Sequence, residues 1–332
     1  MSPQNAPHPS PANPSAEAPL LDVRDLRVEY LTGRGPVRAV DGVSFAIRPG
    51  EVVGLAGESG SGKSTIAHAI LRILRPPALI TGGQVLFAGH DTLEMDDAEL
   101  EQFRWQNIAI VFQSAMNALN PVMRIRDQLL DVMLHHGLPK AEANQRAVRL
   151  FDLVGIDPGR LDAYPHQLSG GMRQRAVIAI ALALNPDMLI MDEPTTALDV
   201  VVQKDILQQI SELREKLGFS VLFITHDLSL LVEISDRIAI MYAGEIVERA
   251  PARELFEHPL HPYTLGLMNS FPSISGRKVK LTGIPGSPPD LVAPPGGCRF
   301  HPRCTKAMAI CSQVAPVTKV MSSEHSVACH LY

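Results

Sequence analysis

Residues 57–65, Gly-Glu-Ser-Gly-Ser-Gly-Lys-Ser-Thr, restrict the possible folds of this chain more than any other segment. They match the pattern G-x-x-x-x-G-K-[ST] in full, between a predicted buried strand at 51–56 and a predicted helix at 63–74. Glycines let the backbone wrap around an anion, and the N–H groups at the helix start then face phosphates. We expect Lys63 to contact the β- and γ-phosphates of a nucleotide and Ser64 to bind Mg²⁺. Further nucleotide contacts are expected from Gly57, Ser59, Gly60, Ser61, Gly62 and Thr65.

The composition is that of a globular, mildly acidic protein. Of the 332 residues, 45% are hydrophobic and 20% are charged, and the formal net charge is −5. This acidic balance argues against general nucleic-acid binding, which usually needs a basic face, so we expect no nucleic-acid partner. The sequence has no run of 18 apolar residues that could span a bilayer, and the Pro-rich residues 1–19 lack the pattern of a secretory signal. We predict a disordered tail at 1–19 and a cytoplasmic location.

Short apolar runs alternate with helical patterns along most of the chain. Buried strands are predicted at 108–112, 188–191 and 221–224, with an edge strand at 82–89. Strands that alternate with helices predict an α/β fold with a mostly parallel sheet. A Pro-, Gly- and Ser-rich segment begins near residue 271. We therefore predict one domain at 20–270, with a helical part at about 114–170, and a separate C-terminal extension at 271–332.

Two acidic residues follow the apolar strand at 188–191. Ligands of open α/β sheets bind beyond the carboxyl ends of the strands, where Asp192 and Glu193 are expected to lie. We predict that Asp192 holds Mg²⁺, directly or through water, and that Glu193 accepts a proton from an attacking water or positions it. The alternative is a pair of exposed acids at a strand end, which the phosphate loop upstream disfavours.

A third motif, Leu-Ser-Gly-Gly-Met-Arg-Gln at 168–174, resembles the signature of ATP-binding-cassette (ABC) ATPases. The order of phosphate loop, signature and acid pair is also that of the family. The resemblance covers residues 20 to about 270. It implies a P-loop NTPase fold, with a RecA-like parallel core, an antiparallel β subdomain and a helical subdomain, and it implies ATP hydrolysis.

The resemblance assigns expected roles to further residues. Gln113 follows the strand at 108–112, like the family's glutamine that contacts the metal or water and senses the membrane partner. Asp199 ends an Ala-Leu-Asp segment like the D-loop, and His226 matches the switch histidine that contacts the γ-phosphate. Tyr30 is the aromatic residue expected to stack on adenine; the alternative is an ordinary strand-end tyrosine. Phe45 is less suitable because it lies inside a predicted strand.

The signature also predicts a partner. Ser169, Gly170 and Gly171 precede a predicted long helix that begins near Met172, and such a helix start is a second anion site. In ABC ATPases the signature of one subunit closes over the nucleotide on the phosphate loop of another. The resemblance therefore implies a head-to-tail dimer with a second ABC ATPase subunit, which is either a copy of this chain or a different chain.

The C-terminal part resembles the extension of oligopeptide/dipeptide importer ATPases. The segments that carry this resemblance are His-Pro-Leu-His-Pro-Tyr-Thr at 258–264, Ile-Pro-Gly-Ser-Pro-Pro at 284–289 and Cys-Arg-Phe-His-Pro-Arg-Cys at 298–304. The resemblance implies peptide uptake through two membrane-spanning permease subunits with a solute-binding protein, and a peripheral position at the cytoplasmic side of the cell membrane. The alternatives are import of nickel or another small solute, and a soluble ABC ATPase that acts on nucleic acid.

All four cysteines of the chain lie in its last 35 residues, at positions Cys298, Cys304, Cys311 and Cys329. In a reducing cytoplasm a metal site explains this clustering better than disulfides do. The spacing is not diagnostic, although four thiolates can form one site. Some members of the resembled family hold a [4Fe–4S] cluster here. We therefore predict an iron–sulfur cluster, with Zn²⁺ as the second choice and unligated thiols as the remaining alternative. Nearby histidines are competing ligands: His301, His325 and His330.

Overall fold

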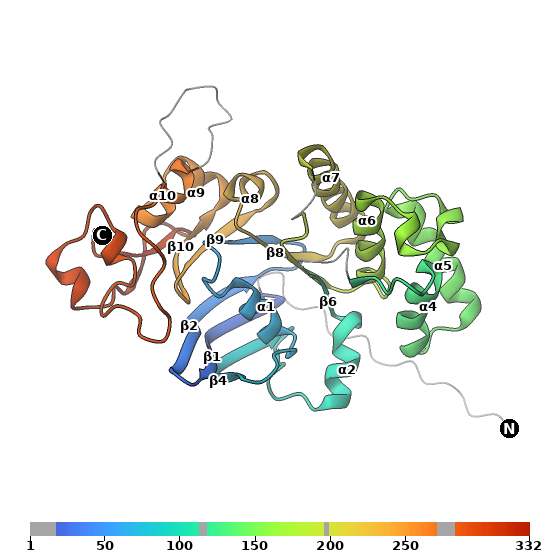
Figure 1. Cartoon of the computed structure of the whole chain (residues 1–332), viewed down its shortest axis with the longest axis horizontal. Helices are drawn as coiled ribbons and strands as arrows, with labels where there is room; N and C mark the ends of the chain where they lie inside the picture. The colour runs from blue at the N-terminus through green and yellow to red at the C-terminus, as the bar shows by residue number, and fades with distance from the viewer. Residues whose placement is uncertain (1–17, 113–117, 196–198, 271–282) are drawn as a thin grey trace.

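Two β-sheets organise the chain, one large and mostly parallel, the other small and antiparallel (Figure 1). The structure is a computed structural model that describes residues 18–112, 118–195, 199–270 and 283–332. Within these residues the strand order of the large sheet is β11-β12-β10-β9-β3-β8-β7-β6, and that of the small sheet is β2-β1-β4-β5.

The centre of the large sheet is a block of parallel strands. In spatial order these are β9 (Arg237–Tyr242), β3 (Val52–Ala56), β8 (Ser220–Thr225), β7 (Met188–Asp192) and β6 (Ile108–Val111). Every residue of β3, β7 and β8 is buried, as continuous apolar runs are when helices or sheets cover both faces of a parallel sheet. The α/β fold class predicted from the sequence is therefore confirmed.

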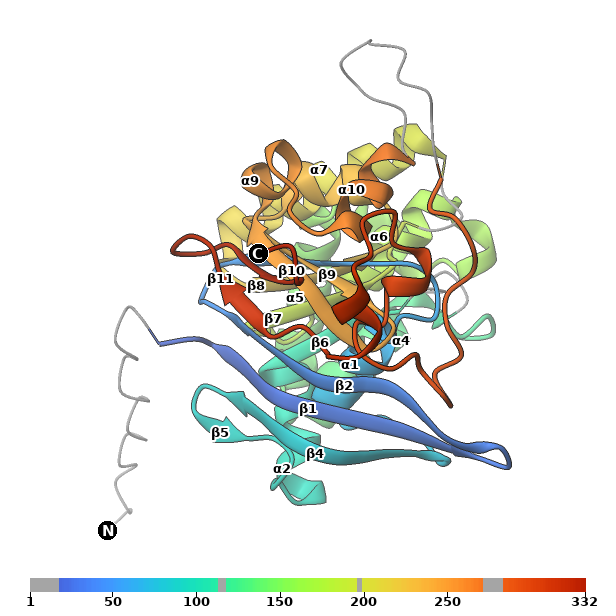
Figure 2. The same cartoon turned by 90° about the vertical axis from the view of Figure 1, so that its left-hand side faces the viewer.

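The small sheet consists of β1 (Leu21–Thr32), β2 (Gly35–Ile47), β4 (Ala78–Phe87) and β5 (His90–Asp91). In Figure 2, β1, β2 and β4 run side by side across the lower part of the molecule. The strand predicted at 82–89 is longer than expected and begins at Ala78. The reason is tertiary, because Ala78 pairs with Tyr30 of β1 and the pairing continues from there.

Two apolar cores cover the opposite faces of the parallel strands, since successive side chains of a strand point to opposite faces. Met188 and Ile190 of β7 join the core shared with the small sheet and with α1 (Lys63–Ile70). Leu189 and Met191 join the larger core beneath the other helices. The small sheet, α1 and α2 (Asp97–Gln106) thus form one layer of the molecule, and the remaining described helices form the other.

The helical region carries α4 (Ile125–His135), α5 (Lys140–Leu153) and α6 (Gly170–Ala181), which pack against one another. Helix α6 begins at Gly170, before the predicted start, because Ser169 caps it: its Oγ accepts a hydrogen bond from the N–H of Met172 at 3.2 Å. The other described helices are α2 (Asp97–Gln106), α7 (Val200–Leu217), α8 (Leu228–Ile234), α9 (Ala252–Glu257) and α10 (Pro262–Asn269); short 3₁₀ turns lie at Pro158–Asp162, Pro165–Gln167, His301–Arg303 and Ala309–Ser312.

The C-terminal extension continues the large sheet. Strand β12 (Ser326–Ala328) pairs antiparallel with β10 (Glu245–Pro251), and β11 (Thr318–Val320) pairs with β12 at the sheet edge. The extension is therefore joined to the nucleotide-site domain through backbone hydrogen bonds. The sequence predicted a separate module here and gave no sign of this pairing.

Candidate functional site

The phosphate loop lies between the end of β3 and the start of α1, as its motif predicted. Gly57 and Gly62 have positive φ angles of 154° and 105°. A Cβ at Gly57 would stand 2.2 Å from the carbonyl oxygen of Met241, and one at Gly62 would stand 2.0 Å from that of Ala39. No residue with a side chain fits at either position without moving the backbone. The close packing of β2 and β9 on this loop thus explains the glycines at positions 57 and 62.

Lys63 is buried against its own loop. Its Nζ donates hydrogen bonds to the carbonyl oxygens of Gly57, at 2.8 Å, and of Glu58, at 2.9 Å. Burial lowers the pKa of Lys63, while the carboxylates of Glu193 and Asp192 act in the opposite direction. The loop therefore holds an ammonium group beside the ends of β3 and β7, where a bound phosphate requires a cation.

The acid pair meets the phosphate loop at the carboxyl ends of the strands. The Ser64 hydroxyl donates to Oδ1 of Asp192 at 3.1 Å, and Asp192 is only 3% exposed. Burial raises the pKa of Asp192, and the hydrogen bond from Ser64 partly offsets this. These two oxygen atoms are of the hard type that Mg²⁺ binds, so their chemistry and position fit the expected metal.

Glu193 and His226 lie together at the same edge. Glu193 follows β7 with a φ of 47°, and its N–H donates to the carbonyl of Ile224 in the neighbouring strand β8. The Nδ1 atom of His226 lies 3.2 Å from Oε1 of Glu193. The structure thus brings together the predicted proton acceptor and the predicted switch histidine, 33 residues apart in the chain.

Tyr30 and the signature occupy different surroundings. The hydroxyl groups of Tyr30 and Thr65 are 3.3 Å apart, which places the tyrosine beside the first turn of α1. Ser169, by contrast, is exposed at the start of α6, which packs on α4, α5, α7 and β6. Asp199 caps α7 by accepting a hydrogen bond from the N–H of Val202 at 3.0 Å. Gln113, Ala197 and Leu198 lie outside the described residues.

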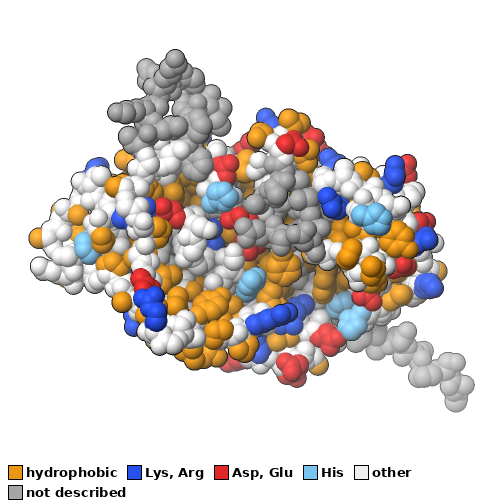
Figure 3. All heavy atoms as spheres, in the orientation of Figure 1, with side chains coloured by type: hydrophobic (Ala, Val, Ile, Leu, Met, Phe, Trp, Pro, Cys, Tyr) orange, Lys and Arg blue, Asp and Glu red, His pale blue; other side chains and the backbone are white. Residues whose placement is uncertain are grey.

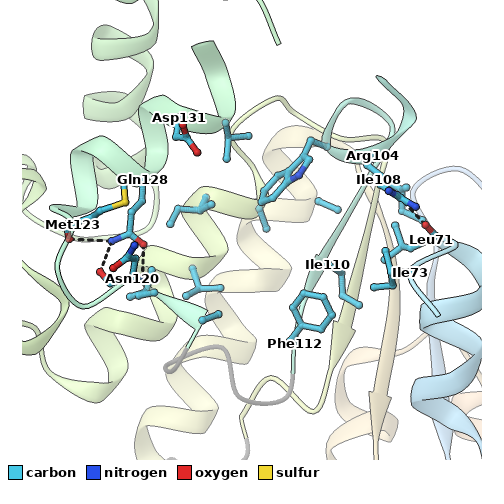
Figure 4. Close-up of a pocket in the computed structure, with 18 residues that line it drawn as sticks. Leu71, Ile73, Arg104, Ile108, Ile110, Phe112, Asn120, Met123, Gln128 and Asp131 are labelled. Carbon is cyan, nitrogen blue, oxygen red and sulfur yellow. Dashed lines mark hydrogen bonds between the residues drawn. The ribbon is translucent and has the colours of Figure 1, made fainter. Parts of the chain in front are cut away.

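An apolar pocket of about 500 Å³ separates the helical region from the end of α1 and strand β6 (Figure 4). Ile110 and Phe112 extend from β6 toward it, and Gln128 of α4 forms its opposite wall. Gln128 is fixed there by hydrogen bonds to Asn120 and Met123, with N–O distances of 2.9–3.1 Å. Sequence analysis missed this pocket, because its lining residues come from segments that the fold brings together.

The predicted metal site at the cysteines is not supported. Among the described residues, no three His, Cys, Asp or Glu side chains are arranged to hold a metal ion. The Sγ atoms of Cys304 and Cys311 accept backbone hydrogen bonds at 3.4 Å. Burial raises the pKa of Cys298 to about 11, and the nearby thiols of Cys311, Cys329 and Cys304 act in the same direction. The [4Fe–4S] and Zn²⁺ predictions at Cys298, Cys304, Cys311 and Cys329 are therefore not supported by the described residues.

The competing histidines are engaged with protein groups. The Nδ1 atom of His301 lies 2.8 Å from the carbonyl oxygen of Cys298, and Nε2 of His330 lies 2.8 Å from that of Val314. His325 is buried between two carboxylates.

In the part of the chain that the structure describes, no helix has both the length and the apolar character needed to cross a membrane.

Two family models match this chain. The model "ABC transporter" matches residues 40–196, which include the phosphate loop, the signature and the acid pair. The model "Oligopeptide/dipeptide transporter, C-terminal region" matches residues 247–311.

Curated relatives align over most of their length. The chain is 43% identical to a dipeptide transport ATP-binding protein of Caldanaerobacter subterraneus, covering 94% of this chain and 97% of that protein. It is 44% identical to an oligopeptide transport ATP-binding protein of Salmonella typhimurium, covering 93% and 91%. Among solved structures, the dimeric bacterial ABC transporter cassette MJ0796 is 30% identical with a TM-score of 0.63, covering 70% of this chain and 99% of that one.

The parallel sheet, the phosphate loop joined to the acid pair, and the exposed signature helix define an ABC ATPase cassette. More closely, the chain belongs to the family of oligopeptide/dipeptide ABC transporter ATP-binding proteins.

Proposed function

We propose that this chain is the ATP-hydrolysing subunit of an ABC importer that takes up di- and oligopeptides through separate membrane subunits. The observation that carries the proposal is the convergence of Lys63, the Ser64–Asp192 hydrogen bond and the Glu193–His226 contact at one edge of the sheet. Relatives named for dipeptide and oligopeptide transport support the class of solute.

The residues at this edge have distinct roles in the proposed reaction. Lys63 exchanges its loop carbonyls for the β- and γ-phosphates of ATP. Ser64 and Asp192 hold Mg²⁺, which when bound neutralises phosphate charge. Glu193 accepts a proton from the attacking water, and His226, 3.2 Å away, positions that carboxylate and contacts the γ-phosphate. Tyr30 stacks on adenine beside Thr65. Gln113 is assigned its role toward metal or water from the resemblance alone.

A second ABC ATPase subunit completes each site. Ser169 is exposed and starts a helix whose N-terminal N–H groups attract anions, yet this helix packs on the helical side of its own subunit. The start of α6 is therefore available to contact the nucleotide bound by a facing subunit. The structural neighbour MJ0796 is described as a dimer, including a post-hydrolysis state bound to ADP and Pi. Either a copy of this chain or a different ATPase chain serves as the partner.

The permease subunits dock, we propose, at the apolar pocket between the helical region and β6. The pocket adjoins Phe112, which directly precedes Gln113 in the sequence, so a partner bound there lies next in sequence to the residue that the resemblance assigns to the metal or water. Phe112 is 39% exposed, and Trp105 contributes a further aromatic surface. In this proposal the chain lies at the cytoplasmic face of the membrane and contacts two membrane-spanning permease subunits, and a solute-binding protein acts on the opposite side of the membrane.

Two alternatives make different predictions. An importer of nickel or another small solute shares this ATPase, since other subunits select the solute. A soluble ABC ATPase acting on nucleic acid requires a basic face, whereas Figure 3 shows Lys and Arg side chains scattered among acidic and apolar ones over the face drawn. The names of the relatives favour peptides over both.

The test is to isolate the complex from membranes through this chain and to measure its ATP hydrolysis with peptides, with Ni²⁺ and with DNA. We expect membrane-spanning companion chains and hydrolysis stimulated by peptide delivered with the solute-binding protein. Stimulation by Ni²⁺ alone identifies the small-solute importer. Salt-sensitive DNA binding without membrane companions contradicts the transport function.

A further inference from the structure

An arginine of the C-terminal extension forms an ion pair with the phosphate loop. Both terminal nitrogens of Arg303 contact the carboxylate of Glu58, NH1 to Oε2 at 2.6 Å and NH2 to Oε1 at 2.9 Å. This is the parallel, two-bond geometry that arginine forms with a carboxylate, among the strongest hydrogen-bonded ion pairs. Glu58 is the second residue of the phosphate loop, and 245 residues separate the two partners.

The pair is built into the protein interior. The side chain of Arg303 is only 5% exposed and that of Glu58 is 26% exposed. The Nε atom of Arg303 also donates to the carbonyl of Pro285 at 2.8 Å, and its guanidinium lies over the Tyr242 ring, 5.7 Å from the ring centre. Such a group is ordered by its surroundings, unlike the two partners of an exposed surface pair.

Glu58 is held at each of its polar groups. Its carboxylate binds Arg303, its N–H donates to the hydroxyl of Tyr263 at 2.8 Å, and its carbonyl accepts from Lys63 Nζ at 2.9 Å. Tyr242 and Tyr263 form an aromatic cluster with Phe300 of the extension beside Glu58. The ring centres are 4.6–5.3 Å apart. The extension therefore contributes, through Arg303, to holding the loop residue that precedes the phosphate-binding N–H groups.

The negative charge of Glu58 explains why its ion pair with Arg303 affects the binding of an anionic ligand such as ATP. Burial lowers the pKa of Lys63, and Glu58 is among the carboxylates that oppose this effect, so its charge acts within the loop. An unpaired carboxylate at this position repels a triphosphate. The bidentate arginine cancels that charge while keeping the loop backbone in place.

We propose that Arg303 is a positioning residue for ATP binding: it neutralises Glu58 and fixes the phosphate loop, so the docked extension raises the affinity for ATP. The inference rests on the proposed ATP site. By thermodynamic linkage, bound ATP in turn strengthens docking of the extension. The extension is then part of the nucleotide-binding apparatus as well as a family-specific addition.

The test is ATP affinity, measured by equilibrium binding to the full chain, for Arg303→Gln, Glu58→Gln and the double variant. We expect Arg303→Gln to weaken binding about tenfold, within the usual range of coupling between sites. Glu58→Gln should bind ATP at least as tightly as the wild type, and the double variant should recover most of the affinity lost in Arg303→Gln. In hydrolysis assays the loss should appear in KM rather than in kcat.

Asp290→Asn is the matched control. It breaks another ion pair between the extension and the rest of the chain, in which Arg34 and Asp290 lie 2.5 Å apart and are exposed, and which includes no residue of the loop motif. We expect its ATP affinity to match that of the wild type. Unchanged affinity in Arg303→Gln, or a double variant as weak as Arg303→Gln, overturns the inference.

Two further results keep the test decisive. If Arg303→Gln does not fold, a large loss of affinity in folded Glu58→Gln overturns the electrostatic role, and retained affinity supports it. Arg303→Lys keeps the positive charge but cannot form both hydrogen bonds to the carboxylate. Its ATP affinity should lie between those of the wild type and Arg303→Gln. Absence of ATP binding by the wild type contradicts the proposed function itself, a result distinct from equal binding by wild type and variants.

Discussion

The hydroxyl of Ser64 donates a hydrogen bond to Oδ1 of Asp192 at 3.1 Å, across 128 residues of sequence. One partner begins the helix that follows the phosphate loop, and the other ends a neighbouring buried strand. The two predicted Mg²⁺ ligands therefore meet because β3 and β7 run parallel, on either side of β8, and end at the same edge of the sheet.

Glu193→Gln tests the proposed proton acceptor. The amide keeps the size of the side chain but cannot accept the proton, so we expect turnover to fall about 10²–10⁴-fold while ATP binding is retained. ATP-bound dimers should accumulate, as measured by size-exclusion chromatography with ATP. Glu233→Gln, at an exposed position on α8, is the control. Normal turnover in Glu193→Gln contradicts the assigned role.

Asp192→Asn should separate stability from function. Burial raises the pKa of Asp192, so the folded state binds a proton more readily than the unfolded state, and the ionised group costs stability as pH rises through the acidic range toward neutrality. We expect the ATP-free Asp192→Asn chain to melt at or above the wild-type temperature at pH 7, and its Mg²⁺-dependent ATP binding to be lost. Calorimetry and binding assays measure the two effects; a lower melting temperature counts against this account.

His261 predicts a pH dependence of folding stability. It is 1% exposed, and its Nδ1 accepts a hydrogen bond from the N–H of Tyr263 at 3.0 Å, which requires an unprotonated nitrogen. Burial lowers its pKa to about 4, so the unfolded state binds more protons between pH 6.5 and 4. The contribution of the neutral His261 to the free energy of unfolding is fully present above pH 6.5. It decreases as the pH falls, by about 3 kcal/mol at pH 4.

Denaturant unfolding between pH 7 and pH 4 measures this effect. His261→Asn, which can still cap α10 but does not titrate, should show a shallower decline than the wild type. Equal slopes for the two proteins rule out His261 as the source.

His325 holds the extension to the sheet. It is 2% exposed, with Nε2 2.8 Å from Oε1 of Glu248 and Nδ1 2.9 Å from Oε1 of Glu254. His325→Ala removes this hydrogen-bond partner from the buried carboxylate of Glu248, which keeps the N–H groups of Leu260 and His261. We expect a cost of about 1–3 kcal/mol. Hydrogen exchange at residues 318–332 should increase sharply. His330→Ala, which removes only a contact to a backbone carbonyl, is the control, and equal exchange in both variants contradicts the role of His325.

The cassette was predictable from sequence because its signals are local. The phosphate loop, the strand before Asp192 and the signature at 168–174 each depend on neighbouring residues, so their patterns can be recognised without the fold. The parallel arrangement of β3 and β7 followed from the alternation of strands and helices. That alternation was enough to expect Lys63, Asp192 and Glu193 at one edge.

The extension was less predictable because its contacts are distant in sequence. No local sequence pattern indicates that β12 pairs with β10 or that Arg303 forms an ion pair with Glu58. The four cysteines show the reverse case. Their clustering was plain in the sequence, but a metal site also needs ligand atoms arranged around one point, and no such arrangement is found among the described residues.

Sequence patterns were sufficient for the family, the fold class and the positions of the nucleotide motifs, because glycine patterns and apolar periodicities act over a few residues. The folded structure was needed to see how the extension joins the cassette, which side chain neutralises Glu58, and where an apolar pocket opens beside Phe112. These features depend on groups brought together across the fold, where burial and charge pairing, rather than local propensity, set the energy.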